Sequence, residues 1–219
     1  MRNFSGRLFG GSCFLCRGAA SALICGACDA DLPRLGGELC PRCALESPDG
    51  QICGRCLAQP PHYDATVAAL AYAFPADALV QALKFRGELA LSSLLGKLLA
   101  DRIAPATVDR VIAVPLSAAR LRERGYNQSV EIARHVAPGK LDLDSCVRTR
   151  DAPAQMGLPI DERRRNVRGA FECTRTLVGE RVAVLDDVMT TGATLDEIAG
   201  ALKRSGAAYV VNWVVARTA

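Results

Sequence analysis

The fold of this chain is decided by Val182-Ala183-Val184-Leu185-Asp186-Asp187-Val188-Met189-Thr190-Thr191-Gly192-Ala193-Thr194. The segment reads as a buried strand, an acidic pair, a short loop and the start of a helix. Gly192 permits a tight backbone path, and a helix that begins near Ala193 directs its free N–H groups at an anion. Hydroxyl groups add further donors from Thr190, Thr191 and Thr194. We therefore expect a phosphate-binding loop, the phosphate loop, at residues 190–194.

The two carboxylates before this loop narrow the class of ligand. Dinucleotide sites and P-loops use Gly-x-Gly-x-x-Gly or a Gly-Lys-Ser/Thr ending, and the segment carries neither pattern. A carboxylate accepts hydrogen bonds through two oxygens, so an acidic pair suits the vicinal hydroxyls of a ribose. The sequence thus predicts a sugar 5-phosphate site formed by Asp186, Asp187, Thr190, Thr191, Gly192, Ala193 and Thr194. The alternative is a capped strand-to-helix turn whose acids are only solvated.

Strands alternate with helices before and after this segment. We expect strands at 65–74, 108–114, 141–148, 181–185 and 208–216. Helices are expected at 76–85, 89–103, 117–136 and 193–205, with a break at Gly125 before the helix proper at Asn127. Such alternation is typical of a parallel α/β sheet flanked by helices. Residues 150–168 are rich in arginine and lack a period, which indicates a functional or mobile segment.

Eight of the ten cysteines precede residue 57 and form four Cys-x-x-Cys pairs. The pairs are Cys13 with Cys16, Cys25 with Cys28, Cys40 with Cys43, and Cys53 with Cys56. Eight residues separate the first pair from the second and nine separate the third from the fourth, so two similar units stand in tandem. Each unit predicts one structural zinc ion held by four cysteines. Sequential pairing follows from the repeat, while an interleaved pairing uses the same ligands; redox pairs or disulfides are the alternatives to zinc.

The cysteines also divide the chain. Residues 1–60 are expected to form a module built on zinc-bound cysteines, and residues 61–219, which are rich in apolar runs, an α/β domain with an ordinary core. The first residues lack the apolar stretch of a secretory signal, and no uncharged run approaches the ~20 residues of a membrane span. We expect a cytoplasmic protein without membrane insertion.

The net charge of +4 is unevenly placed along the chain. Residues 120–170 hold 11 Lys and Arg against 7 Asp and Glu, so the remainder balances at 16 against 16. A basic segment indicates an anionic partner, either pyrophosphate or nucleic acid. Aromatic residues are few, and the candidates for stacking on nucleobases are Phe14, Tyr126, Phe171 and Trp213.

The phosphate loop with its acidic pair closely resembles the binding motif for phosphoribosyl pyrophosphate (PRPP) in type I phosphoribosyltransferases. Across nearly the whole chain the sequence resembles the competence protein F (ComF) family. This resemblance implies a double zinc-ribbon module at residues 1–60 and a phosphoribosyltransferase-like domain at residues 61–219. The resemblance is carried by the paired cysteines and by Leu83-Lys84-Phe85-Arg86-Gly87, Val114-Pro115-Leu116, Arg122-Glu123-Arg124-Gly125-Tyr126-Asn127-Gln128, Gln155-Met156-Gly157-Leu158 and Arg163-Arg164-Arg165-Asn166-Val167-Arg168-Gly169-Ala170-Phe171.

The resemblance implies further site residues. The loop that receives pyrophosphate in the family matches Val114, Pro115, Leu116 and Ser117. A flexible loop that covers the site in relatives matches residues 155–168. In the family, Mg²⁺ joins the diphosphate to the ribose hydroxyls. From the residues alone, Arg120, Arg122 and Arg124 behind a strand end are where a diphosphate is clamped, unless they form a solvated helix face. Lys84 and Arg86 are site contributors by resemblance only, and no catalytic base is identified.

Two functions follow from these features. The first is a PRPP-binding phosphoribosyltransferase-like protein of DNA uptake and natural transformation, with PRPP or a related sugar phosphate as ligand. The alternative is a competence factor that binds single-stranded DNA without phosphoribosyl transfer, through Arg163, Arg164, Arg165 and Arg168 and the zinc module, together with other DNA-uptake proteins. A scaffold acting only through its zinc module is a third reading. The acceptor substrate and the oligomeric state are left open.

Overall fold

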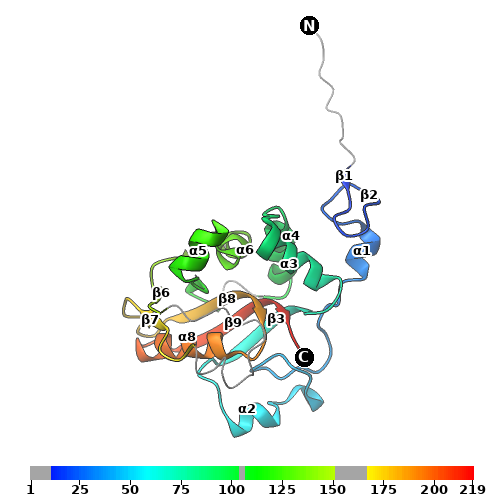
Figure 1. Ribbon diagram of the computed structural model, residues 1–219. Coiled ribbons are helices and arrows are strands. Elements are labelled where there is room, and N and C mark those ends of the chain that lie inside the picture. Colours follow the sequence, from blue (N-terminus) through cyan, green and yellow to red (C-terminus); the bar gives the residue numbers. More distant parts are fainter. Residues whose placement is uncertain (1–10, 104–106, 151–166) are drawn as a thin grey trace.

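The computed structural model describes residues 11–103, 107–150 and 167–219. Its centre is a five-stranded sheet in the order β3-β9-β8-β4-β5, with every neighbouring pair parallel. Figure 1 shows β3, β9 and β8 of this sheet. The strands are β3 (Ala65–Ala71), β4 (Arg110–Ala113), β5 (Leu141–Asp142), β8 (Arg181–Met189) and β9 (Tyr209–Arg217). Apolar runs such as Val182–Leu185 are buried completely, as expected for parallel strands covered on both faces.

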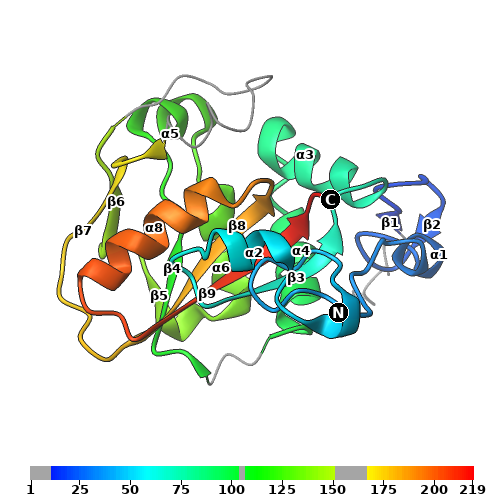
Figure 2. The same cartoon turned by 90° about the horizontal axis from the view of Figure 1, so that it is seen from below.

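Helices cover both faces of the sheet. The helices α3 (Ala76–Arg86), α4 (Leu91–Ala100) and α6 (Gln128–Val136) pack their leucines and Ile132 against one face. On the other face lies α8 (Ala193–Arg204), whose Leu195, Ile198 and Leu202 meet the sheet (Figure 2). The predicted fold class, a parallel sheet flanked by helices, is confirmed. No helix within the described ranges has the length and apolar character needed to cross a membrane.

The break predicted at Gly125 is confirmed. The helix α5 (Ala118–Arg124) ends there because Gly125 adopts the left-handed conformation with φ of 78°, and α6 then begins after Asn127. Asn127 caps α6 by accepting hydrogen bonds from the N–H groups of Ser129, at 3.0 Å, and Val130, at 3.4 Å.

The single strand predicted at 141–148 is wrong. The Asp142 side chain accepts hydrogen bonds from the N–H groups of Asp144, at 2.8 Å, and Ser145, at 2.9 Å, and this local turn ends β5. The chain resumes as β6 (Cys146–Arg148), which pairs antiparallel with the unpredicted strand β7 (Phe171–Cys173) in a separate ribbon. The predicted strand at 65–74 likewise stops early, at Ala71.

The cysteine-rich segment forms two small ribbons with little regular structure. The first ribbon, residues 13–28, contains β2 (Ala19–Ala20) and the start of α1 (Gly26–Ala30), and β1 (Gly11–Ser12) precedes it. The second ribbon, residues 40–56, contains a 3₁₀ turn at Pro48–Gly50 and the start of α2 (Gly54–Ala58). Figures 1 and 2 draw the first ribbon beside α3 and α4 and the second on the side of the sheet that carries α8.

The strand order creates one switch point. From β4 the chain passes outward to β5, with α5, α6 and the 3₁₀ turn Pro138–Lys140 between them, whereas from β8 it passes through α8 in the opposite direction to β9. The connections that leave the carboxyl ends of the adjacent strands β4 and β8 therefore separate toward opposite faces of the sheet. In open α/β sheets, ligands bind in the crevice that such a divergence opens.

Candidate functional site

The acidic pair projects from the sheet at this switch point. The prediction placed the strand end at Leu185, but β8 continues to Met189 because β9 pairs with it as far as Arg217. On its other side β8 has no such partner, since β4 ends at Ala113, opposite Leu185. Asp186 and Asp187 are thus held by one neighbouring strand and lie beyond the end of the other.

Asp186 is partly buried and is held by hydrogen bonds. The Ser129 hydroxyl on α6 donates to Asp186 Oδ1 at 3.0 Å, and the N–H of Asp187 donates to the same oxygen at 2.9 Å. Burial and the neighbouring charge of Asp187 raise the pKa of Asp186 to about 7, against the opposing effect of Lys84. The carboxyl group therefore changes protonation state near neutral pH.

Asp187 has a different environment, because it is only 2% exposed and forms an ion pair with Lys84 of α3. Lys84 Nζ lies 3.0 Å from Asp187 Oδ2 and 3.4 Å from Oδ1, and the Val188 N–H donates to Oδ1 at 2.9 Å. Burial opposes the charge of Lys84, but the two aspartates outweigh it and raise the pKa of the ammonium group. The two acids, alike in the sequence, thus divide into one open and one neutralised carboxylate.

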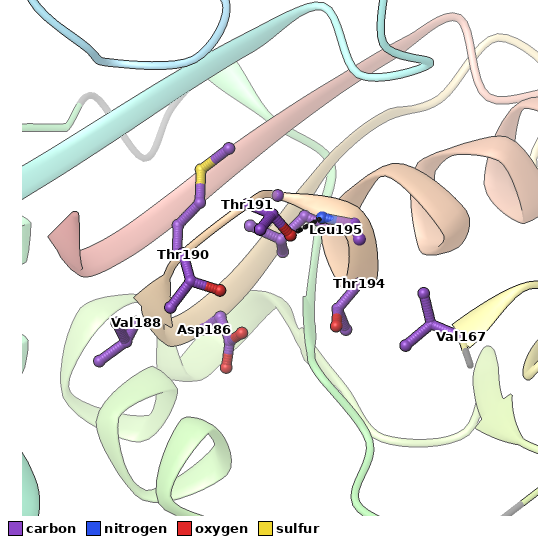
Figure 3. Close-up of a pocket in the computed structure, with 10 residues that line it drawn as sticks. Val167, Asp186, Val188, Thr190, Thr191, Thr194 and Leu195 are labelled. Atoms are coloured by element: carbon purple, nitrogen blue, oxygen red, sulfur yellow. Dashed lines mark hydrogen bonds between the residues drawn. The ribbon is translucent and has the colours of Figure 1, made fainter. Parts of the chain in front are cut away.

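The phosphate loop and the open acid line a hollow of about 70 Å³. Figure 3 shows the oxygens of Asp186, Thr190 and Thr194 around it. Its lining consists of Val167, Asp186 and Val188 together with every residue from Met189 to Leu195. Asp187 is absent from this lining among the described residues, as its ion pair requires.

Gly192 sets the backbone path of the phosphate loop. Its φ is 82°, and an added Cβ would lie 2.7 Å from Met189 Cε and 3.1 Å from the Tyr63 hydroxyl. The helix α8 starts directly after it, and the first helical hydrogen bond runs from Asp196 N–H to the Gly192 carbonyl at 2.8 Å. The N–H of Ala193 donates to Thr191 Oγ1 at 3.3 Å, whereas those of Thr194 and Leu195 have no intrahelical partner. This is the donor arrangement that binds an anion at a helix N-terminus.

The loop predicted to receive pyrophosphate, residues 114–117, follows the neighbouring strand β4. Asn127 Nδ2 donates to the Val114 carbonyl at 3.0 Å, and Ser117 caps α5 by accepting from the Arg120 N–H at 3.3 Å. The start of α6 therefore connects the two halves of the crevice, because Asn127 holds the β4 loop and Ser129 holds Asp186. The hollow described above does not include residues 114–117.

The three arginines behind that loop lie on and at the end of α5. Arg122 is exposed and Arg120 partly exposed, and within the described part of the chain none of the ion pairs involves Arg120, Arg122 or Arg124. Arg124 donates a hydrogen bond to Gln128 Oε1, and its guanidinium lies 5.5 Å from the centre of the Phe85 ring. Of the second arginine cluster, Arg163, Arg164 and Arg165 lie outside the described residues, and Arg168 is exposed.

Two of the four aromatic candidates for stacking were wrong. Trp213 is 2% and Phe171 4% exposed, because both face the core from strands. The Tyr126 hydroxyl donates a hydrogen bond to the Leu83 carbonyl, and Phe14 is partly buried against the core. Among the described residues, the exposed phenylalanine rings are those of Phe85, at 63%, and Phe74, at 79%. Phe85 follows Lys84 in the sequence of α3.

The eight early cysteines gather into two groups of four, and the predicted sequential pairing is confirmed. One group contains Cys13, Cys16, Cys25 and Cys28, and the other Cys40, Cys43, Cys53 and Cys56, with all sulfurs of a group within 4.8 Å of one another. The Cys16–Cys25 and Cys43–Cys53 sulfur pairs are 3.7 Å apart. A tetrahedral site with Zn–S bonds of ~2.3 Å needs sulfurs ~3.8 Å apart, whereas a disulfide needs ~2.05 Å. Both groups therefore fit structural zinc, and the interleaved pairing does not occur.

Arg217 is a site residue that the sequence reasoning missed. It is 3% exposed at the end of β9, where its Nη1 donates to the carbonyls of Met189, at 3.0 Å, and of Thr190. Its Nε donates to the Cys43 carbonyl at 2.9 Å. The available signal was a lone arginine at the end of an otherwise apolar strand. Ser129 and Tyr63, which reach the acid and the phosphate loop from elsewhere in the chain, had no local signal.

Known proteins resemble both parts of the chain. A family model described as a double zinc ribbon domain matches residues 5–57. The DNA utilization protein YhgH of Escherichia coli O157:H7 is 35% identical over 95% of this chain and 97% of its own length. Competence protein F of Haemophilus influenzae is 32% identical over 67% of this chain and 69% of its own, and competence protein ComFC of Streptococcus pneumoniae 25% identical over 89% and 87%.

Two solved structures match part of the chain. A purine phosphoribosyltransferase from Pyrococcus horikoshii matches with 18% identity and a TM-score of 0.31, over 67% of this chain and 74% of its own. An allosteric regulatory enzyme of purine biosynthesis matches with 24% identity and a TM-score of 0.37, over 56% of this chain and 25% of its own. At these scores the likeness to either structure is partial.

Proposed function

We propose a function from one premise: the chain belongs to the ComF family of competence and DNA utilization proteins. The protein binds PRPP through a phosphoribosyltransferase-like site and acts in the cytoplasm in the handling of incoming DNA, with other DNA-uptake proteins as partners. It consists of a zinc-ribbon module, residues 1–60, and a PRPP-binding domain, residues 61–219.

The observation that carries this proposal is the hollow at the switch point, where one carboxylate and an anion-binding helix start share a space. The 5-phosphate of PRPP is held by the N–H groups and hydroxyls of residues 190–194. The ribose hydroxyls lie against Asp186. Asp187 contributes through the backbone and through Lys84, which fixes its position, and at 2% exposure its carboxylate is too buried to meet the sugar directly.

The pyrophosphate group lies on the β4 side of the crevice. The 114–117 loop receives it, and Arg120, Arg122 and Arg124 supply positive charge from α5. Mg²⁺ would accompany PRPP and offset the charge of its diphosphate, and Asp186 would be the carboxylate available to hold it, because Asp187 is paired with Lys84. If transfer occurs, the bond from the anomeric carbon to pyrophosphate breaks and an acceptor forms the new bond there, so the site acts mainly by positioning and charge stabilisation.

Thermal unfolding with and without Mg²⁺–PRPP tests the binding step. A ligand at 100 times its dissociation constant adds about 2.7 kcal/mol, which raises Tm by about 5–11 °C in a domain of this size. We expect that shift in the parent protein and in Asp101→Asn, whose exposed carboxylate lies at the end of α4. The shift should vanish in Asp186→Asn combined with Thr190→Val and Thr194→Val. A parent protein that shows no shift contradicts the proposal.

Turnover needs a separate measurement. PRPP consumption with detection of released pyrophosphate, across free nucleobases and single-stranded DNA as acceptors, separates a transferase from a binding protein. Release that depends on one acceptor identifies the substrate. Binding without release in any mixture favours a sensor or carrier of PRPP.

A second candidate function is binding of single-stranded DNA without transfer. It is favoured by the exposed Phe85 ring beside Arg124, since base stacking on aromatic rings and arginines is the usual recognition of single strands. Fluorescence anisotropy with labelled oligonucleotides should then show affinity that falls steeply with salt. Unchanged affinity after replacement of Arg163, Arg164 and Arg165 by alanine would remove that cluster from the binding surface.

A further inference from the structure

The second ribbon and the phosphate loop meet at one buried guanidinium. Arg217 donates to the Cys43 carbonyl on one side and to the Met189 and Thr190 carbonyls on the other. The Cys43 carbonyl belongs to the turn that presents two of the four sulfurs of the second ribbon. A single side chain thus joins the predicted zinc ligands to the backbone of the loop that is proposed to hold the 5-phosphate.

These hydrogen bonds orient the peptides of the loop. In a trans peptide the C=O of one residue and the N–H of the next point in opposite directions. Because the Thr190 carbonyl is directed at Arg217, the N–H of Thr191 points away from the guanidinium. Two carbonyl oxygens that would repel a phosphate are turned toward a cation, and a donor is left for the ligand.

The second ribbon also supplies negative charge near the buried guanidinium of Arg217. Burying a guanidinium is costly unless a negative group lies near it, and none of the ion pairs among residues 11–103, 107–150 and 167–219 includes Arg217. Four thiolates around Zn²⁺ leave a formal charge of about −2. The exposed Arg55 of α2 also interacts with Cys43 and Cys56, so a second positive charge lies beside these thiolates.

Packing couples the same two elements. Tyr63 and Met189 lie in one buried cluster with Cys40, Cys43 and Cys56. The same two side chains pack against Gly192 of the phosphate loop, where an added Cβ would clash with them. A second hydrogen bond, from Thr66 N–H to the Pro41 carbonyl at 3.0 Å, fixes the turn of the second ribbon to β3. The first ribbon differs, since no hydrogen bond among the described residues joins residues 13–28 to residues 189–195.

We propose that the second ribbon is part of the phosphate site: zinc bound there holds the phosphate loop in its anion-binding form through Arg217, while zinc in the first ribbon does not. Arg217 is a positioning residue in this arrangement and touches no ligand. The inference rests on the proposed function only for the identity of the ligand. The dependence of the loop on the second ribbon concerns the protein alone.

Hydrogen exchange on the full chain, read at the amides of Ala193, Asp196 and Thr218, tests the proposal without any ligand. These N–H groups are protected because they donate to Thr191 Oγ1 and to the carbonyls of Gly192 and Met189. We expect Arg217→Lys, which keeps the charge but loses the forked donors, to raise exchange there about tenfold or more while zinc content stays at two per chain. Arg181→Lys, at the exposed start of the same sheet, is the matched control and should change nothing at the loop. Unchanged exchange in Arg217→Lys overturns the proposal.

Two variants of the zinc-binding cysteines distinguish the effects of the two ribbons, and they test the proposal even if Arg217→Lys does not fold. Cys16→Ser and Cys53→Ser each remove one accessible sulfur from a different group, and each should lower zinc content by metal analysis. Only Cys53→Ser should raise exchange at the amides of Ala193, Asp196 and Thr218 and weaken Mg²⁺–PRPP binding at least tenfold. Equal effects of both variants overturn the proposal. If the variants show the expected exchange pattern but the parent protein binds no PRPP, the dependence of the phosphate loop on the second ribbon stands, and PRPP is rejected as the ligand.

Discussion

Removing Lys84 should show how strongly the acidic pair depends on α3. The change Lys84→Met keeps the length of the side chain and leaves Asp187, 2% exposed, without its cation. Loss of one partner from a buried ion pair costs about 3–5 kcal/mol. The side chain of Lys84 is 29% exposed, so water can partly replace it, and we expect the lower value of about 2–3 kcal/mol.

The measurement is urea and thermal unfolding of four proteins: parent, Lys84→Met, Asp187→Asn and the double variant. At about 2–4 °C per kcal/mol, Tm of Lys84→Met should fall by about 4–12 °C. The double variant should recover at least ~1 kcal/mol relative to the sum of the single losses, because no unpaired charge remains buried. Lys97→Met on the exposed face of α4 is the control and should change stability by less than ~0.5 kcal/mol.

Single losses that simply add would refute the assignment of Lys84 as the counterion of Asp187.

Three further predictions concern the mouth of the site. Burial raises the pKa of Asp186 to about 7, so the affinity of the parent for Mg²⁺–PRPP, measured by calorimetry, should rise with pH up to that value and then level off. In Asp186→Asn this pH dependence should be flattened. The same group stabilises the free parent near pH 4, and that contribution is lost as pH rises through 7. Gly192→Ala should cost about 1–3 kcal/mol in urea unfolding and weaken PRPP binding, whereas Gly179→Ala, with φ of 77° and open space around it, should cost only the backbone strain. Phe85→Ala should weaken binding of labelled single-stranded DNA by about 5-fold or more in anisotropy, and Phe74→Ala, which is more exposed but has no arginine over its ring, should leave it unchanged.

The sequence predicted the parts of this protein that local chemistry decides. The turn at Gly192 and the start of α8 follow from a glycine directly before a helical pattern, and the helix break from Gly125. The zinc ligands follow from spacing alone. Each of these features is fixed by neighbours in the chain, so its signal is contiguous.

Contacts between distant segments had no such signal. Lys84 and Asp187 are 103 residues apart, and Arg217 and Cys43 are 174 apart. Burial was equally hidden, because composition does not say on which face of a strand a ring lies: Trp213 and Phe171 proved to be core residues, and the exposed Phe85 had been seen only as part of a motif. The division of the two aspartates into an open and a neutralised carboxylate needed the position of α3.

That division explains how a site with two adjacent carboxylates suits an anionic ligand. Two ionised acids at a strand end would repel a diphosphate. Lys84 cancels the charge of Asp187, and the raised pKa of Asp186 keeps part of that carboxyl group protonated near pH 7. The start of α8 and the arginines of α5 then contribute positive potential on both sides. A bound divalent cation would complete the ionisation of Asp186, so metal and sugar phosphate are expected to bind with mutual dependence and with release of a proton.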